Sequence, residues 1–118
     1  MKWLAPDRLL INGGGAVATT VLSWPEMQDV QIWSAWQLNT CESALVYKDR
    51  VYTTTYGFQL NTFHVNGQIE ESAFPFEDYA TSLAIVGDNL LLAGGRGAFL
   101  TLFALRDGLA QIISLKRF

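Results

Sequence analysis

The sequence has few of the residues that usually build metal sites, nucleophilic sites or covalent cross-links. Its 118 residues include one cysteine, one histidine and three prolines. The single cysteine, Cys41, excludes an internal disulfide framework, and the single histidine, His64, excludes a His-rich metal site. We therefore expect a fold that its apolar core stabilises, with no bound metal and no cofactor.

Charge is also scarce, and neither sign forms a run. Eight Lys and Arg residues stand against eleven Asp and Glu residues, which gives a net charge of −3. A dedicated nucleic-acid-binding protein needs cationic side chains to displace phosphate counterions, so we expect no nucleic-acid partner. The hydrophobic content of 50% excludes an intrinsically disordered chain, and the length fits one domain.

Long apolar runs are missing as well. No stretch approaches the roughly 20 residues of a membrane-spanning helix. The N-terminal segment reaches Pro6 and Asp7 before the apolar region of a signal peptide could form. We expect no signal peptide, no membrane insertion, and a soluble protein that is cytoplasmic or part of a particle.

What the sequence does contain is an internal repeat of about 40 residues. Aspartates at positions 7, 49 and 88 each precede a run of strand-forming residues and then glycine. A threonine follows thirteen positions after each aspartate, at Thr20, Thr62 and Thr101. The alignment predicts three units in one domain, at about 1–40, 41–79 and 80–118. It places His64 in the same column as Leu22 and Phe103, inside a strand.

Each unit is predicted to contain four strands and no helix. Its apolar runs are short, rich in β-branched or aromatic residues, and separated by turn signals such as Asn66-Gly67 and Asp107-Gly108. The predicted strands cover about 2–6, 8–12, 16–23 and 29–36, then 43–48, 50–56, 58–65 and 68–74, then 81–87, 89–94, 98–105 and 109–116. The last strand of each unit has more polar residues, as over 68–72, which favours a water-facing sheet edge.

Four antiparallel strands in a unit of about 40 residues are typical of a β-propeller blade. Over 81–95 and 100–108 the chain resembles propellers of the WD40 and kelch kind. The double glycines Gly13-Gly14 and Gly94-Gly95, each after an apolar strand, are similar to those of kelch repeats. The second unit lacks the double glycine, and no unit carries a Trp-Asp dipeptide.

The resemblance implies an all-β fold of three blade-like repeats, which are too few to close a ring. We expect a homodimer in which two chains form a six-bladed propeller, with blade 3 of each chain against blade 1 of the other. The alternative is a β-trefoil, which also contains three four-stranded repeats and closes within one chain.

No pattern of catalytic residues is present. No serine lies in a Gly-x-Ser-x-Gly motif, and the glycine clusters lead into strands, whereas a phosphate-binding loop leads into a helix. We therefore expect a protein that is not an enzyme.

Propellers usually bind partners on the loops that join the second and third strands and on the loops between blades. Carried over by resemblance, the partner or ligand face includes Tyr56, Phe58, Glu77, Asp78, Tyr79 and Arg96. Tryptophan supplies large contact areas at protein interfaces and also stacks on sugar rings. Trp24, Trp33 and Trp36 are therefore candidates for an interface or for glycan stacking.

The sequence thus favours a non-catalytic interaction or structural module that binds itself and other proteins. Two alternatives stay open at this point: a carbohydrate-binding lectin, and a structural component of a virion or other particle.

Overall fold

The computed structural model describes residues 2–12, 17–34, 41–55, 58–65 and 68–118. These ranges contain twelve β-strands and no helix, which confirms the all-β class. Sheet 1 consists of β1 (Lys2–Ala5), β2 (Arg8–Asn12), β3 (Val17–Ser23) and β4 (Asp29–Ser34). Sheet 2 consists of β5 (Cys41–Tyr47), β6 (Arg50–Thr55), β7 (Leu60–His64) and β8 (Ile69–Ala73). Sheet 3 consists of β9 (Ala80–Gly87), β10 (Leu90–Gly95), β11 (Phe99–Arg106) and β12 (Leu109–Arg117).

Each sheet is a simple antiparallel meander. Its four strands pair in chain order, so that the fourth strand, β4, β8 or β12, lies at an edge as predicted. Within the described ranges, every strand pairing stays inside one sheet. A β-trefoil instead pairs strands from its three repeats in a shared barrel, so the trefoil alternative does not fit.

The strands form because their side chains alternate between two packing environments. Strand β11 shows this most clearly: Phe99, Thr101, Phe103 and Leu105 are buried, and the residues between them are not. A period of two places the buried set on one face of the sheet. That face points toward sheet 2, because Phe103 and Leu105 belong to a core cluster that includes residues of sheet 2.

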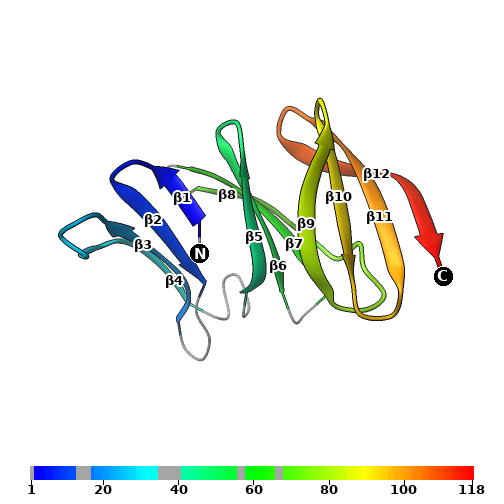
Figure 1. Ribbon diagram of the computed structural model, residues 1–118, viewed down its shortest axis with the longest axis horizontal. Helices are drawn as coiled ribbons and strands as arrows, with labels where there is room; N and C mark the ends of the chain where they lie inside the picture. The colour runs from blue at the N-terminus through cyan, green and yellow to red at the C-terminus, as the bar shows by residue number, and fades with distance from the viewer. Residues whose placement is uncertain (1, 13–16, 35–40, 56–57, 66–67) are drawn as a thin grey trace.

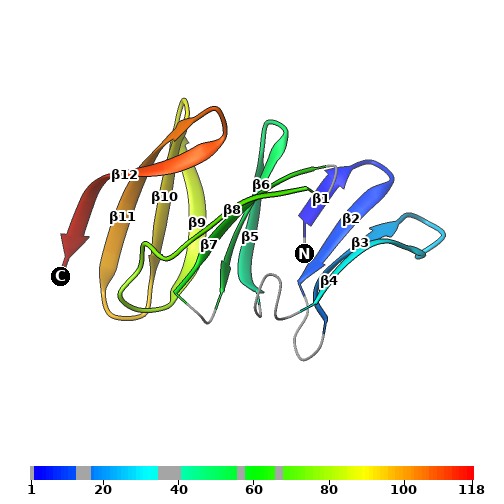
Figure 2. The ribbon, with the colours of Figure 1, turned by 180° about the vertical axis from the view of Figure 1, so that it is seen from behind.

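The three sheets stand side by side in chain order, with sheet 2 between the other two (Figures 1 and 2). One apolar cluster joins sheets 1 and 2, around Leu10, Val21, Val51 and Phe63. A larger cluster joins sheets 2 and 3. The main contacts between sheets run through their first two strands, from β1 and β2 to β5, and from β5 and β6 to β9. The sheets are therefore packed most closely along one side of the molecule.

The strand registers correct one detail of the repeat alignment. The pairing of the second and third strands aligns Phe63, not His64, with Leu22 and Phe103. Six residues separate the paired Asn12 and Thr19, one more than separate the equivalent pair Thr54 and Leu60. Asp88 also stands one place earlier in its turn than Asp49. These offsets cancel between units 1 and 3 but displace unit 2 by one residue. A shift of one residue changes the face of a strand, so His64 lies on the other face from its predicted column.

Candidate functional site

The loop residues predicted from the resemblance meet at the end of the molecule where β6 leads to β7 and β10 leads to β11. The rings of Phe58 and Tyr79 are stacked with centroids 5.0 Å apart. The guanidinium of Arg96 lies 4.2 Å from the centre of the Tyr79 ring, and its Nε lies 3.1 Å from Asp78 Oδ1. We call Phe58, Asp78, Tyr79 and Arg96 the aromatic–arginine cluster. Tyr56 lies outside the described residues.

Asp78 organises this cluster electrostatically. Its Oδ1 accepts a hydrogen bond from the backbone N–H of Tyr79 at 2.7 Å, in addition to the Arg96 contact. The Tyr79 N–H and the Arg96 guanidinium together hold the pKa of the Asp78 carboxyl below its ordinary value, against a smaller opposing effect of desolvation. The carboxylate therefore stays charged and keeps the Arg96 side chain over the Tyr79 ring.

Glu77 does not join the cluster. It pairs instead with Arg117 at 2.5 Å, so this linker residue contacts the end of β12. Arg117 was not among the predicted site residues. Its contact with residue 77 depends on how β12 passes the linker between sheets 2 and 3, and no local pattern in the sequence indicates that.

A cavity of about 200 Å³ lies beside the cluster, between the linker after β8 and the strands β11 and β12. Its lining is mixed: the apolar Pro75, Phe76, Phe99 and Leu115 lie beside the ion-paired Glu77, Asp78 and Arg117. Thr101 also lines it, is only 1% exposed, and has a buried Oγ1 without a hydrogen-bond partner. From the sequence, Thr101 was identified only as one of the threonines that mark the repeat.

The predicted tryptophan site is only partly described by the structure. Trp24 makes an edge-to-face contact with Trp3, with ring centroids 5.8 Å apart. These rings stay 41% and 53% exposed. Trp33 lies in β4 but its side chain is outside the described part, as is Trp36. Trp3, which the prediction left out, is thus the described partner of Trp24, and glycan stacking stays a prediction.

The Trp3–Trp24 pair borders an apolar face of sheet 1 on which Leu9 is buried and Ile11 and Leu22 are half-buried. Leu10 and Val21 point into the cluster shared with sheet 2, so the alternation of side chains places Leu9, Ile11 and Leu22 on the opposite face. Trp3 pairs with Leu9 and belongs to the same face. Among the described strands, none from another sheet packs on it. We call this surface the open face of sheet 1.

Sheet 3 has an uncovered apolar face at the other end of the molecule. The face toward sheet 2 carries the buried Phe103 and its neighbours, so the alternation places another set on the far side. This set includes alanine and leucine residues that are exposed or half-buried: Ala84, Leu92, Leu100, Leu102 and Ala104. Polar residues share the face at its first and fourth strands: Ser82, Gln111, Ser114 and Lys116. We call this surface the open face of sheet 3.

Equivalent positions in the repeat show what the open face of sheet 1 lacks. Leu22, Phe63 and Phe103 occupy the same register position in their sheets. Phe63 and Phe103 are 0% and 1% exposed, because each packs against the preceding sheet. Leu22 stands at the same position in sheet 1, where no described sheet packs on this face. The open face of sheet 1 therefore has the pattern of a surface that receives another sheet.

The open face of sheet 3 shows the complementary pattern. Leu10, Tyr52 and Leu92 share one register position, counted from the first hairpin of each sheet. Leu10 is covered by the following sheet 2, and Tyr52 by the following sheet 3. No sheet among the described residues covers Leu92 in this way. The two open faces thus match the two sides of an ordinary contact between neighbouring sheets.

Polar contacts at the opposite end from the cluster join the hairpins of sheets 2 and 3. Lys48 Nζ donates to Asn89 Oδ1 at 2.9 Å, and the Asn89 backbone N–H donates to the Tyr47 hydroxyl at 3.1 Å. The buried Tyr52 hydroxyl donates to the Gly108 carbonyl at 2.7 Å. Burial raises the pKa of Tyr52 to about 12. These contacts fix the position of one sheet against the next.

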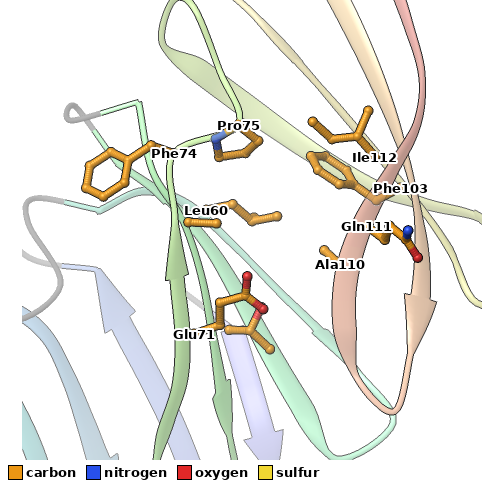
Figure 3. A pocket seen from close by; sticks show the side chains of 10 residues that line it. Leu60, Glu71, Phe74, Pro75, Phe103, Ala110, Gln111 and Ile112 are labelled. Atoms are coloured by element: carbon orange, nitrogen blue, oxygen red, sulfur yellow. The ribbon is translucent and has the colours of Figure 1, made fainter.

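A second cavity, of about 380 Å³, opens between the outer strands of sheets 2 and 3. Figure 3 shows Leu60 and Glu71 on the sheet 2 side, opposite Phe103, Ala110 and Ile112 on the sheet 3 side. The cavity lies at the fourth strands, away from the closely packed first strands. The space between sheets 2 and 3 therefore widens from their first strands to their fourth strands, which makes their packing wedge-shaped.

Two features are absent from the described part of the chain. No group of three or more His, Cys, Asp or Glu side chains there is placed to hold a metal ion. No helix there has the length and apolar composition needed to cross a membrane.

Comparison with known proteins gives no assignment: no protein-family model and no curated protein matches this chain. Its function is therefore inferred from the geometry described above.

Proposed function

We propose that this chain is a non-catalytic, self-assembling interaction module. Two copies close a six-bladed β-propeller, with the open face of sheet 3 in each copy packed on the open face of sheet 1 in the other. The observation that carries the proposal is the match between the open faces and the covered faces at equivalent register positions. A surface with the same residue pattern as an internal contact between sheets is suited to pack against another sheet of the same kind.

Exposed apolar area supports the same conclusion. Large contiguous apolar patches are uncommon on monomeric proteins and mark interaction sites. Here one patch contains two tryptophans, a residue type enriched in interface hot spots, and the other contains small and aliphatic side chains. Trp3 and Trp24 are large enough to fill space over Ala84 and Ala104 of a second copy.

The divergence of the sheets favours a closed ring over an open filament. A contact between two different surfaces forms a ring when its rotation closes, and otherwise a filament. Wedge-shaped sheets that pack at their first strands turn in one direction around a common axis. Three sheets per chain then give six blades in a dimer, within the four to eight blades that are typical of propellers.

The ring would present one aromatic–arginine cluster per chain, both on the same face because the two-fold axis coincides with the ring axis. Exposed aromatic rings beside an arginine suit recognition of a protein partner. Phe58 is 40% exposed and the Arg96 side chain 66% exposed. This face is the proposed docking surface for other proteins or for neighbouring parts of a larger assembly.

The test is the solution mass of two matched variants, measured by light scattering and native mass spectrometry across a dilution series. Leu100 and Ile69 are both 36% exposed, but only Leu100 lies on an open face. We expect a dimer for the native protein and for Ile69→Asp, and a folded monomer for Leu100→Asp, because a buried unpaired carboxylate opposes association.

A native chain that stays monomeric at every concentration would overturn the proposal. A trimer would replace the six-bladed ring with nine blades. A dimer that survives Leu100→Asp unchanged would mean that association uses another surface.

A further inference from the structure

The last strand, β12, is a long and exposed edge strand with many apolar residues. It has nine residues, whereas β4 has six and β8 has five. Among the described strands only β11 pairs with it, so no described strand lies along its other edge. The side chains of Ile112, Ile113 and Leu115 on this strand are exposed. Bare apolar edges readily pair with another chain, and proteins usually protect them with charged residues.

The fourth strand of sheet 2 has the protection that β12 lacks. β8 contains Glu70 and Glu71 within its five residues. β12 has no charged residue from Leu109 to Leu115. A β-bulge at Ile113 shifts its pairing with β11, but the strand continues on both sides of the bulge. The free edge of β12 is therefore suited to pair with an added strand.

The pairing with β11 shows which backbone groups of β12 point to this free edge. The Phe118 N–H donates to the carbonyl of Ala98, the residue before β11. Residues of an antiparallel pair alternate between those that exchange hydrogen bonds and those that do not. Counted back in the same register, Lys116 bonds to β11, and the N–H of Leu115 points to the free edge. An extended chain beside β12 can bond to such outward groups.

The cavity of about 380 Å³ between sheets 2 and 3 borders the same strand. Ala110 and Ile112 of β12 line it beside Phe103, and Leu60 lies opposite them (Figure 3). Alternate residues of a strand point to the same side. An added strand next to β12 would therefore place every second side chain toward this cavity. Its largely apolar lining favours apolar side chains at those positions.

The charges of β12 indicate what the other side of the added strand should carry. Its only charged residues, Lys116 and Arg117, are basic, although the whole chain has a net charge of −3. Arg117 is paired with Glu77. Lys116 lies on the side away from the cavity, because it pairs with Leu100 in the sheet. Carboxylates on that side of an added strand would complement the Lys116 ammonium.

We propose that the free edge of β12 binds an extended, acidic segment of a partner protein by strand addition. Every second side chain of the segment is apolar and faces the cavity, and acidic side chains alternate with them on the side of Lys116. This partner belongs to the proposed interaction function. Its binding does not require a closed ring, because the edge lies within one chain.

The probes are four fluorescent peptides of sequence Glu-X-Glu-X-Glu-X-Glu, in which X is Val, Ile, Leu or Phe. Their binding to the native protein is measured by fluorescence anisotropy. We expect at least one peptide to bind. The same peptide with lysine in place of glutamate should bind about five- to tenfold more weakly, because its charge has the sign of Lys116 and Arg117.

N-methylation of the bound peptide tests the backbone contact without any change in the protein. Only one of the two alternating sets of residues directs its N–H groups toward β12. Methylating three residues of that set should abolish binding, and methylating three residues of the other set should preserve it. The two peptides have the same mass and charge, so each is the control for the other.

Leu115→Pro and Leu115→Ala are the matched protein variants. Proline removes the N–H that points to the free edge and keeps the bonds from β12 to β11, so the sheet should still form. Leu115→Pro should weaken peptide binding about tenfold relative to Leu115→Ala, which loses the same side chain but keeps the N–H.

Four outcomes would each overturn the proposal. They are the absence of binding by all four peptides, equal affinity of the lysine and glutamate peptides, equal affinity of the two methylated peptides, and equal affinity of the two Leu115 variants. The peptide affinity can be measured whatever the solution mass of the protein, so this proposal and the proposed ring can fail separately.

Discussion

Sheets 2 and 3 offer a comparison between a covered face and an uncovered face at equivalent positions. On the side that points to the following sheet, sheet 2 has Thr62 where sheet 3 has Leu102. Thr62 is buried, whereas Leu102 is half-buried and no sheet in the described part of the chain covers it. If exposure to water alone determined the residue at each position, the leucine would be covered and the threonine would be exposed.

The same contrast appears at two neighbouring positions. Thr54 and Leu60 of sheet 2 are both buried, and their equivalents in sheet 3 are Gly94 and Leu100. The face that water reaches in the isolated chain is thus no more polar than the face that sheet 3 covers. Exposure to water therefore does not explain the apolar character of the open faces. This is the main argument that a partner covers them.

The largest expected loss of stability comes from a change at a covered aromatic position. Phe63→Ala should lower the free energy of unfolding by about 3–5 kcal/mol, because it removes a fully buried ring from the junction of sheets 1 and 2. The loss should be the same at every protein concentration in urea denaturation.

Leu22→Ala provides the matched change at the equivalent uncovered position. In the dilute, separated chain it should cost less than about 1 kcal/mol, and the cost should increase with concentration as copies associate. Equal, concentration-independent losses for both variants would contradict the idea that Leu22 faces a second copy.

An intermediate loss of stability is expected at the covered junction of sheets 2 and 3. Tyr52→Phe should cost about 1 kcal/mol, because the Gly108 carbonyl loses its donor. The native protein should also lose stability in alkali. The folded pKa of Tyr52, about 12, exceeds its ordinary value of 10.0, so its contribution is complete below pH 10 and is lost as the pH rises toward 12. Urea titrations between pH 9 and about 12 should show this slope for the native protein and a smaller one for Tyr52→Phe.

The smallest expected effect concerns the loop end. The pKa of Asp78, followed by NMR of its carboxyl carbon, should lie below 3.8 and should rise in Arg96→Gln. It should stay below the ordinary value in that variant, because the Tyr79 N–H still donates to the carboxylate. Since the folded pKa is lowered, the stabilising contribution is present above pH 3.8 and is lost as the pH falls through the folded value.

Arg117→Gln is the control for this titration, since Arg117 pairs with Glu77 and not with Asp78. A pKa of Asp78 that moves equally in both variants would show that the aromatic–arginine cluster does not act as a local unit.

Much of the fold could be predicted from local patterns. The short β-branched runs and the Asn-Gly and Asp-Gly turns indicated the strands to within a few residues, because strand propensity and turn chemistry are local properties. The pairing register of the strands was harder to predict from the sequence. The placement of His64 was wrong by one residue, since the length of a connection is not evident until the strands on both sides are paired.

The residues of the candidate site were also predicted only in part. Phe58, Asp78, Tyr79 and Arg96 were predicted from their place in loops, and they do come together. Arg117 was missed, because a residue near the C-terminus reaches a linker only through the packing of two sheets.

The sequence by itself therefore determined the strands, their turns and the repeat, all of which depend on residues close together in the chain. Only the tertiary structure decided which faces are covered and which are open, and which side chains surround the cavity at Thr101. These features depend on contacts between sheets, where residues far apart in the sequence meet. No local preference encodes such contacts.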